Sequence, residues 1–205
     1  MAKLTSSFKN MVIALFGVTL IASASLGLVN DVTKAPIAKA ELEKQTKAIA
    51  AVLPEFEQLG TAYKVLPGDG KDSIEIFPAF DSNGQLIASA VKTYTYDGFS
   101  GYIEVMVGID HSGMLSGFRV LKHAETPGLG SKMDSWFSNA EKPGQNVVGR
   151  SLNEGALSVS NDGGSVDAIT AATITSRAFL SAVNRAYEAL NSEKSVQNKL
   201  GGEAL

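Results

Sequence analysis

The stretch "DAITAATITS", residues 167–176, decides how the C-terminal part of the chain folds. It carries no charge after Asp167, and it holds four Thr or Ser hydroxyls and the adjacent alanines Ala171 and Ala172. A short β-rich segment, residues 166–169, leads into it. After it, apolar residues recur at the spacing of one helix face: Phe179, Ala182, Val183, Ala186, Tyr187 and Leu190. The pattern predicts a strand, a turn of small residues, and a helix from about 174 to 190.

The start of such a helix is a natural anion site. Its first backbone N–H groups have no partner within the helix, and the helix dipole is positive there. Phosphate is the usual ligand at this position, and the small side chains of Ala171 and Ala172 let the backbone approach it closely. The alternative is ordinary capping of the helix by the hydroxyl of Thr170 or Thr173, which is the commoner use of such residues. The residues alone leave both interpretations open.

The segments before this stretch predict mostly β-structure. Alternating or β-branched runs predict strands at 73–77, 85–96, 101–110, 114–123, 156–160 and 166–169. Residues 36–53 have apolar positions at helical spacing, and they predict a helix that opens with Pro36 and is ended by Pro54. Consecutive strands with flanking helices indicate an α+β fold, an antiparallel β meander packed with helices.

The N-terminal region contains an uncharged stretch, residues 11–29, that predicts a transmembrane helix. Its length corresponds to about 28 Å of helix, close to the thickness of the hydrocarbon core. Lys3 and Lys9 precede the stretch and Asp31 follows it. Because basic flanks stay in the cytoplasm, we expect residues 1–10 to be cytoplasmic, residues 30–191 to form an exported (periplasmic) domain and residues 192–205 to be a polar tail. The result would be a single-pass protein of the cell inner membrane. The alternative is a signal peptide cleaved at the small residues 22–24.

Composition excludes several kinds of site. The chain has no cysteine and two histidines, so neither a thiolate centre nor a His-based metal site is expected. The net charge is −3 and no basic block stands out, so no nucleic-acid partner is expected.

Two motifs resemble those of the covalent FMN-binding domain family. "DAITAAT" at 167–173 is similar to the flavinylation motif D-x-x-[ST]-[GA]-A-T, and "HAETPGLG" at 123–130 is similar to H-x-E-T-P-G-L-G, followed by the familiar Lys132 and Trp136. The order and separation of the motifs, together with the N-terminal apolar stretch, most resemble the G subunits of Rnf electron-transport complexes. The C subunits of Na⁺-translocating NADH:quinone reductases are the related family.

The resemblance implies that Thr173 carries FMN through a phosphoester bond to its side-chain oxygen. Ala171 stands where the family commonly has glycine. We expect the hydroxyls of Thr170 and Thr175 to donate hydrogen bonds to the phosphate. The resemblance also implies that a Mg²⁺-dependent flavin transferase makes the bond with FAD as FMN donor, and that this transferase recognises Asp167.

The second motif would supply the side of the site that faces the flavin ring. Pro127 and Gly128 suit the central positions of a type II turn that begins at Thr126. Gly130 is a second place where the backbone can approach a flat ring. Leu129 would cover the apolar dimethylbenzene edge of the flavin. The alternative is a tight loop that binds nothing.

The remaining candidates have less specific patterns. Glu125 would bond either the flavin or the N–H groups of its own loop. Tyr102 is a candidate for the wall of the flavin site, and Trp136 either stacks near the flavin or packs in a small core. We expect His123 to be structural and His111 to be solvated.

The resemblance implies an electron-carrying subunit of a membrane ion-translocating ferredoxin:NAD⁺ oxidoreductase. Its partners would be the other membrane subunits of the complex and the flavin transferase. No independent active site and no catalytic residue are expected in this chain. The alternatives are the C subunit of the related quinone reductase, a stand-alone flavin reductase domain, or a membrane-anchored binding or structural module in which residues 167–176 only cap a helix.

Overall fold

The computed structural model describes residues 7–67 and 72–201, and it divides into two compact units, Met1–Lys44 and Gln45–Leu205. One helix, α1 (Phe8–Val52), contains most of the first unit and ends in the second. The expected boundary between a membrane helix and a separate helix from Pro36 is therefore wrong, because Pro36 lies inside α1. A proline inside a helix costs roughly 3 kcal/mol, but two extra helix ends would leave further backbone groups without partners.

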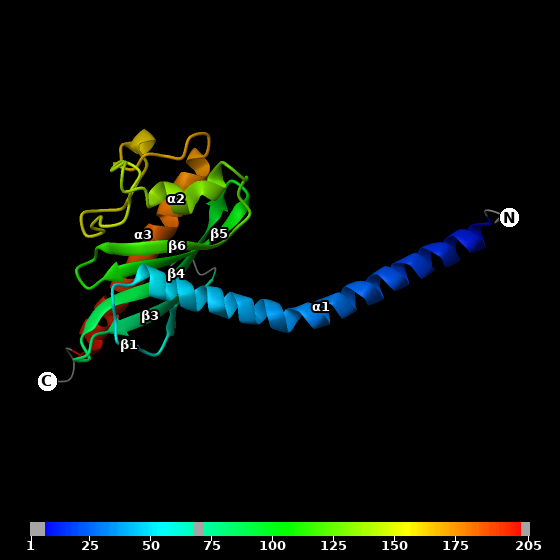
Figure 1. The fold of residues 1–205 in the computed structure, drawn as a ribbon, viewed down its shortest axis with the longest axis horizontal. Helices are drawn as coiled ribbons and strands as arrows, with labels where there is room; N and C mark the ends of the chain where they lie inside the picture. Colours follow the sequence, from blue (N-terminus) through cyan, green and yellow to red (C-terminus); the bar gives the residue numbers. More distant parts are fainter. Residues whose placement is uncertain (1–6, 68–71, 202–205) are drawn as a thin grey trace. The chain divides into compact units, whose positions relative to one another are not determined.

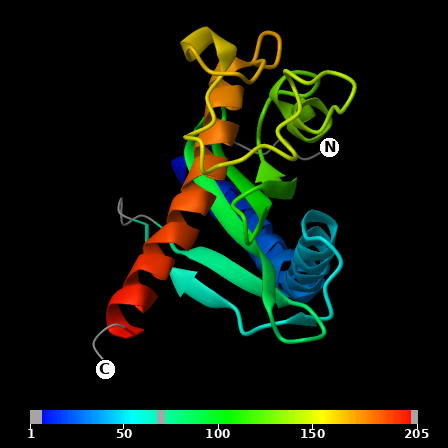
Figure 2. The ribbon, with the colours of Figure 1, turned by 90° about the vertical axis from the view of Figure 1, so that its left-hand side faces the viewer.

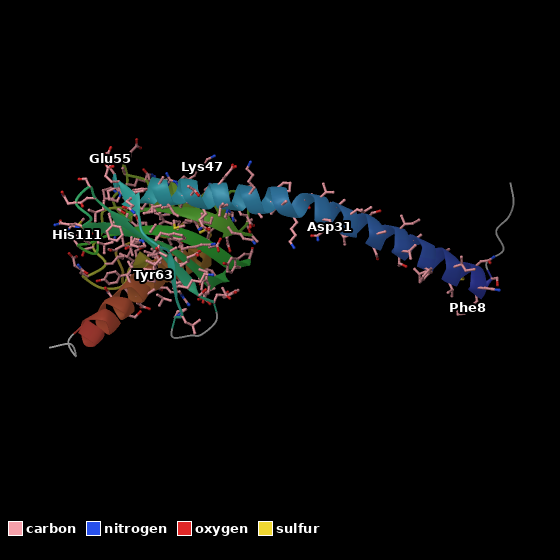
Figure 3. All side chains as sticks on the ribbon, turned by 90° about the horizontal axis from the view of Figure 1, so that it is seen from below. Phe8, Asp31, Lys47, Glu55, Tyr63 and His111 are labelled. Carbon is pink, nitrogen blue, oxygen red and sulfur yellow. The ribbon has the colours of Figure 1, made fainter. Side chains whose placement is uncertain are left out.

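The first unit is exposed along its apolar stretch. Within the described residues, α1 is the one helix that is long and apolar enough to cross a membrane, and none of its most apolar 18-residue window is buried. Figure 3 shows the side chains between Phe8 and Asp31 projecting from the ribbon. Large apolar side chains that face water in this way are typical of a helix whose partner is lipid.

The second unit is built on one antiparallel sheet (Figure 1). Its strands are β1 (Gln58–Leu59), β2 (Tyr63–Val65), β3 (Ile74–Phe80), β4 (Leu86–Gly98), β5 (Gly101–Asp110) and β6 (Leu115–His123). The sheet order is β1-β3-β4-β5-β6, and β2 pairs with β3 beside β1. The predicted meander is confirmed for the three long strands and for β3, while the two shortest strands, β1 and β2, were not predicted.

The two faces of the sheet carry separate cores. Neighbouring residues point to opposite faces, so Val91 and Val105 pack in the core under α3 (Thr173–Gly201), whereas Ala90 and Met106 pack against the last turns of α1. Figure 2 shows α3, coloured orange to red, on one side of the sheet and the cyan end of α1 on the other. The α+β prediction is therefore confirmed as a sheet between two helical layers.

The end of α1 packs closely on the sheet through glycine. A Cβ atom on Gly108 would lie 2.0 Å from the carbonyl oxygen of Val52, and one on Gly117 would lie 3.1 Å from the Val52 Cα. The Ser116 hydroxyl donates to the same Val52 carbonyl at 2.6 Å. The last turns of α1 are therefore part of the fold of the second unit.

The predicted strands at 156–160 and 166–169 are wrong. Val159 and Val166 form one isolated parallel bridge, and residues Ser160–Asp162 form the short 3₁₀ helix η2. The backbone N–H and C=O of Leu157 bond the Asn184 side chain, at 2.9 Å each, instead of a neighbouring strand. Backbone pairing between the two segments is limited to Val166, whose N–H donates to the Ser158 carbonyl at 3.2 Å and whose carbonyl accepts from the Ser160 N–H at 2.7 Å.

The C-terminal helix is longer than predicted. α3 runs from Thr173 to Gly201, so it includes residues 192–201 of the predicted tail. Its predicted apolar stripe is buried in the core on this face of the sheet. The start of the helix at Thr173 agrees with the sequence pattern and positions the site described next.

Candidate functional site

A tight turn at residues 169–172 precedes α3. The Ala172 N–H donates to the Ile169 carbonyl at 2.9 Å, and Ala171 has a φ of 61°. Ala171 is the only non-glycine residue with positive φ in the described part of the chain. The left-handed region costs an L-residue roughly 1–2 kcal/mol, which gives a physical reason for the glycine that the family commonly has at this position.

The four hydroxyls of residues 167–176 have different surroundings. Ser176 is buried and accepts from the Ile169 N–H at 2.9 Å while it donates to the Ala172 carbonyl at 3.0 Å. Thr170 is exposed and Thr173 is partly buried, and neither hydroxyl makes a hydrogen bond within the described structure. The predicted capping by Thr170 or Thr173 is therefore wrong, because neither hydroxyl bonds a backbone group. The Ser176 hydroxyl, in the first turn of α3, bonds the backbone of the turn instead.

The fourth hydroxyl, that of Thr175, belongs to a buried pair. Thr175 is 1% exposed, and its hydroxyl donates to Glu125 Oε2 at 2.5 Å. The expected hydrogen bond from Thr175 to a phosphate is therefore not available in this arrangement. The sequence pattern around Thr175 did not predict this hydrogen bond, because Glu125 lies fifty positions away in the sequence.

The loop after β6 forms the predicted turn. The Leu129 N–H donates to the Thr126 carbonyl at 3.2 Å, and Gly128 has a φ of 77°. These features confirm a type II turn with glycine at its third position. The chain continues into the 3₁₀ helix η1 (Gly130–Lys132) and the short helix α2 (Met133–Phe137).

Glu125 stands at the start of this loop and is 4% exposed. Besides Thr175, it accepts a hydrogen bond at Oε1 from the Ser100 N–H at 3.0 Å. The expectation that it bonds its own loop is wrong, since the donors come from the β4–β5 turn and from α3. Ser100 was not recognised in the sequence, because no motif marks that turn.

These elements enclose a cleft of ≈ 470 Å³. Of the predicted residues, the cleft brings together Glu125, Thr126, Leu129, Gly130, Ala171, Ala172, Thr173 and Thr175. Phe99 and Ile174, which were not predicted, also line it. Thr170, Gly128 and Tyr102 are not among its lining residues. The two motifs, far apart in the sequence, thus form one site.

Three apolar side chains at the cleft face water. Phe99 is 66% exposed, Ile174 49% and Leu129 39%. They come from the β4–β5 turn, the first turn of α3 and the loop after β6, so they approach the cleft from three elements. Exposed apolar groups around a concave site are typical of ligand binding.

Tyr102 lies in a different cluster. Its hydroxyl donates to Glu104 Oε1 at 3.1 Å, and its ring packs 5.2 Å from Tyr96 and 6.3 Å from Tyr94, between ring centroids. Burial, followed by the nearby charge of Glu104, raises the pKa of the Tyr102 hydroxyl. Tyr102 therefore does not line the cleft, and its place in a flavin wall stays a prediction.

Trp136 and Asp167 support the turn from outside the cleft. The Trp136 indole N–H donates to the Asp167 carbonyl at 2.8 Å, and the Asp167 N–H donates to the Gly144 carbonyl at 2.7 Å. Of the two alternatives for Trp136, packing against the core is the one observed. His123 is structural as expected, because its Nδ1 accepts from the Glu125 N–H at 3.2 Å, and His111 is exposed in the β5–β6 turn.

Three other hollows of the described residues share no lining residue with the cleft. No group of three or more His, Asp or Glu residues there is placed to hold a metal ion. One of these hollows, of ≈ 570 Å³, is lined by Asp162, Arg177 and Asn184. Asp162 and Arg177 form an ion pair, with 2.7 Å between Arg177 Nε and Asp162 Oδ2. The Arg177 hydrogen bonds lower the pKa of Asp162, and those of Asp162 raise the pKa of Arg177. None of the predicted site residues lines this hollow.

Comparison with known proteins gives the same assignment as the two motifs. Residues 98–188, which contain both motifs, match the family model of the FMN-binding domain. The G subunit of the ion-translocating oxidoreductase complex of Shewanella amazonensis is 34% identical, covering 83% of this chain and 82% of its own length. The proteins of the same name from Salmonella typhi and Vibrio cholerae are 35% and 33% identical, covering 83% and 92% of this chain and 87% and 92% of their own lengths.

A solved structure is also similar in part. The crystal structure of Shewanella oneidensis NqrC aligns with a TM-score of 0.44 at 26% identity, covering 56% of this chain and 55% of that chain. The three relatives from Shewanella amazonensis, Salmonella typhi and Vibrio cholerae each carry the name of the G subunit of an ion-translocating oxidoreductase complex. With its FMN-binding domain at residues 98–188, the chain belongs to the family of G subunits of Rnf-type ion-translocating oxidoreductase complexes.

Proposed function

We propose that this chain is an electron-carrying subunit of a membrane ion-translocating ferredoxin:NAD⁺ oxidoreductase, and that it relays electrons through FMN bound covalently to Thr173. The observation that carries the proposal is the state of the Thr173 hydroxyl. Of the four hydroxyls in residues 167–176, it alone both lines the cleft and makes no hydrogen bond within the described structure. Thr175 and Ser176 are buried and bonded, and Thr170 lies outside the cleft.

The cleft fits a flavin chemically. Its volume of ≈ 470 Å³ lies within the range of ligand pockets, which is roughly 300–1,000 Å³. A phosphate on Thr173 would stand at the first residue of α3, where free N–H groups and the helix dipole stabilise negative charge. Phe99, Leu129 and Ile174 would shield an apolar ring from water.

When bound, FMN supplies reversible electron transfer, and the protein supplies its position and electrostatic surroundings. A Thr hydroxyl is a weak nucleophile that requires an activating base or metal. The segment between Asp167 and Arg177 contains no His or Lys to act as a base. The flavin transferase would therefore activate Thr173 from outside. Its Oγ–P bond would form as the pyrophosphate P–O bond of FAD breaks, releasing AMP and the hydroxyl proton.

The proposed location follows from α1. Its exposed apolar stretch would span the inner membrane once, and the basic residues before it would keep the N-terminus in the cytoplasm. The domain would then lie on the periplasmic side, next to the other membrane subunits. Covalent attachment is useful there, because an exported domain meets no nucleotide pool that would replace a lost flavin.

Intact mass of the full-length chain tests the attachment. Co-expressed with a flavin transferase, the wild type should gain the mass of FMN less one water, and Thr173→Ala should remain at the mass of the bare chain. Thr126→Ala is the matched control, because Thr126 also lines the cleft but lies in the loop and not at the helix start. A flavin-bearing peptide recovered from Thr173→Ala would contradict the assignment.

A further inference from the structure

We propose that Glu125 is a positioning residue, whose buried carboxylate holds the cleft together and whose negative charge lowers the reduction potential of the flavin. This inference rests on the proposed flavin site. The carboxylate joins two elements that are separate in the sequence. Oε1 accepts from the Ser100 N–H of the β4–β5 turn, and Oε2 accepts from the Thr175 hydroxyl in the first turn of α3.

Two glycines leave the space that the Glu125 carboxylate occupies. A Cβ atom on Gly98 would lie 2.7 Å from Glu125 Oε1, and one on Gly130 would lie 2.7 Å from Oε2 and 2.7 Å from Thr175 Oγ1. Distances this short essentially never occur for real Cβ atoms. The carboxylate is therefore enclosed by two glycine backbones, and both glycines are needed for it to reach its donors.

The main chain of Glu125 is fixed as well. Its N–H donates to His123 Nδ1 at 3.2 Å, and the type II turn of residues 126–129 follows directly. Leu129 and Thr126, which line the cleft, are carried by this turn. Fixing Glu125 at both its backbone and its carboxylate therefore sets where the ring-side loop stands relative to Thr173.

The Glu125 carboxylate has hydrogen-bond partners but no ion-pair partner among the described residues. No Lys, Arg or His of the described chain lies within ion-pair distance of its carboxylate. Both oxygens have a hydrogen-bond partner, a main-chain N–H at Oε1 and a hydroxyl at Oε2. A buried negative charge beside the cleft opposes the arrival of further negative charge there. The reduction potential of a flavin in this cleft should therefore be lower with Glu125 than with a neutral residue.

The test compares full-length variants that carry covalent flavin. Glu125→Gln removes the charge and nearly keeps the shape, whereas Glu125→Asp keeps the charge but shortens the side chain by one methylene. Glu104→Gln is the matched control, because the same change is made at a half-buried carboxylate that lies on the sheet beside Lys92, at 3.6 Å, and outside the cleft. Intact mass is measured first, so that a wild type without flavin counts against the proposed function and not against the role of Glu125.

In a redox titration, Glu125→Gln should show a midpoint potential shifted to more positive values and an altered visible spectrum, while Glu104→Gln should match the wild type. Thermal unfolding of the protein without flavin should show Glu125→Asp less stable than the wild type, because a shorter side chain cannot reach both Ser100 and Thr175. The inference is overturned if Glu125→Gln carries flavin with the potential and spectrum of the wild type. It is also overturned if Glu125→Asp unfolds at the temperature of the wild type, a result that decides the question even where Glu125→Gln does not fold.

Discussion

Replacing Ala171 by glycine should stabilise the protein. Ala171 is exposed and has a φ of 61°, a conformation that costs an L-residue roughly 1–2 kcal/mol. Glycine removes this strain, but it also lowers the free energy of unfolding by about 0.5–1 kcal/mol, because it gives the unfolded chain more conformational freedom. The net gain in the free energy of unfolding should be about 0.5–1 kcal/mol. For a chain of this size, that gain raises the melting temperature by roughly 2 °C.

The assay is thermal unfolding of the detergent-solubilised full-length chain without flavin. The single tryptophan, Trp136, is a local reporter, since its indole N–H donates to the Asp167 carbonyl close to the turn. Ala172→Gly is the matched control. Ala172 is 9% exposed and is not strained, so this change should destabilise the protein by about 1–2 kcal/mol. If Ala171→Gly lowered the melting temperature as much as Ala172→Gly does, the left-handed turn would be refuted.

Two further predictions concern the rest of the chain. Residues 11–29 should remain on the mature protein as a membrane anchor, and N-terminal sequencing of protein extracted from membranes should find the original N-terminus; a mature start within or just after this range would show cleavage instead. Gly108→Ala should destabilise the domain by about 1–3 kcal/mol through overpacking, because its Cβ would lie 2.0 Å from the Val52 carbonyl oxygen. Denaturant unfolding measures this effect.

Much of the fold could be predicted because local pattern and tertiary structure agree. The long strands β4 to β6 alternate or are β-branched, and the apolar stripe of α3 has helical spacing. The segment around Leu157 has similar composition but does not form a strand. There the Asn184 side chain bonds the backbone, and nothing in the local sequence indicates that partner.

In the site, too, local sequence predicted the segments but not the contacts between distant segments. The two motifs identified the loop and the turn that form the cleft, because each motif is local. Phe99 and Ser100 were missed because they belong to a hairpin turn without a motif, and the pairing of Glu125 with Thr175 depends on how the sheet brings the loop to α3. Contacts between distant segments follow from topology, and a single sequence does not specify them directly.

The packing of α1 on the sheet determines where the membrane anchor can be removed. Ala48, Ile49, Val52 and Leu53 cover one apolar face of the sheet, which includes Met106 and Leu121. A protease that cuts before Gln45 would release a domain with this face still covered. A cut after Pro54 would leave the face open to water, and the released sheet would tend to aggregate. A water-soluble form of the domain should therefore keep the last turns of the anchor helix.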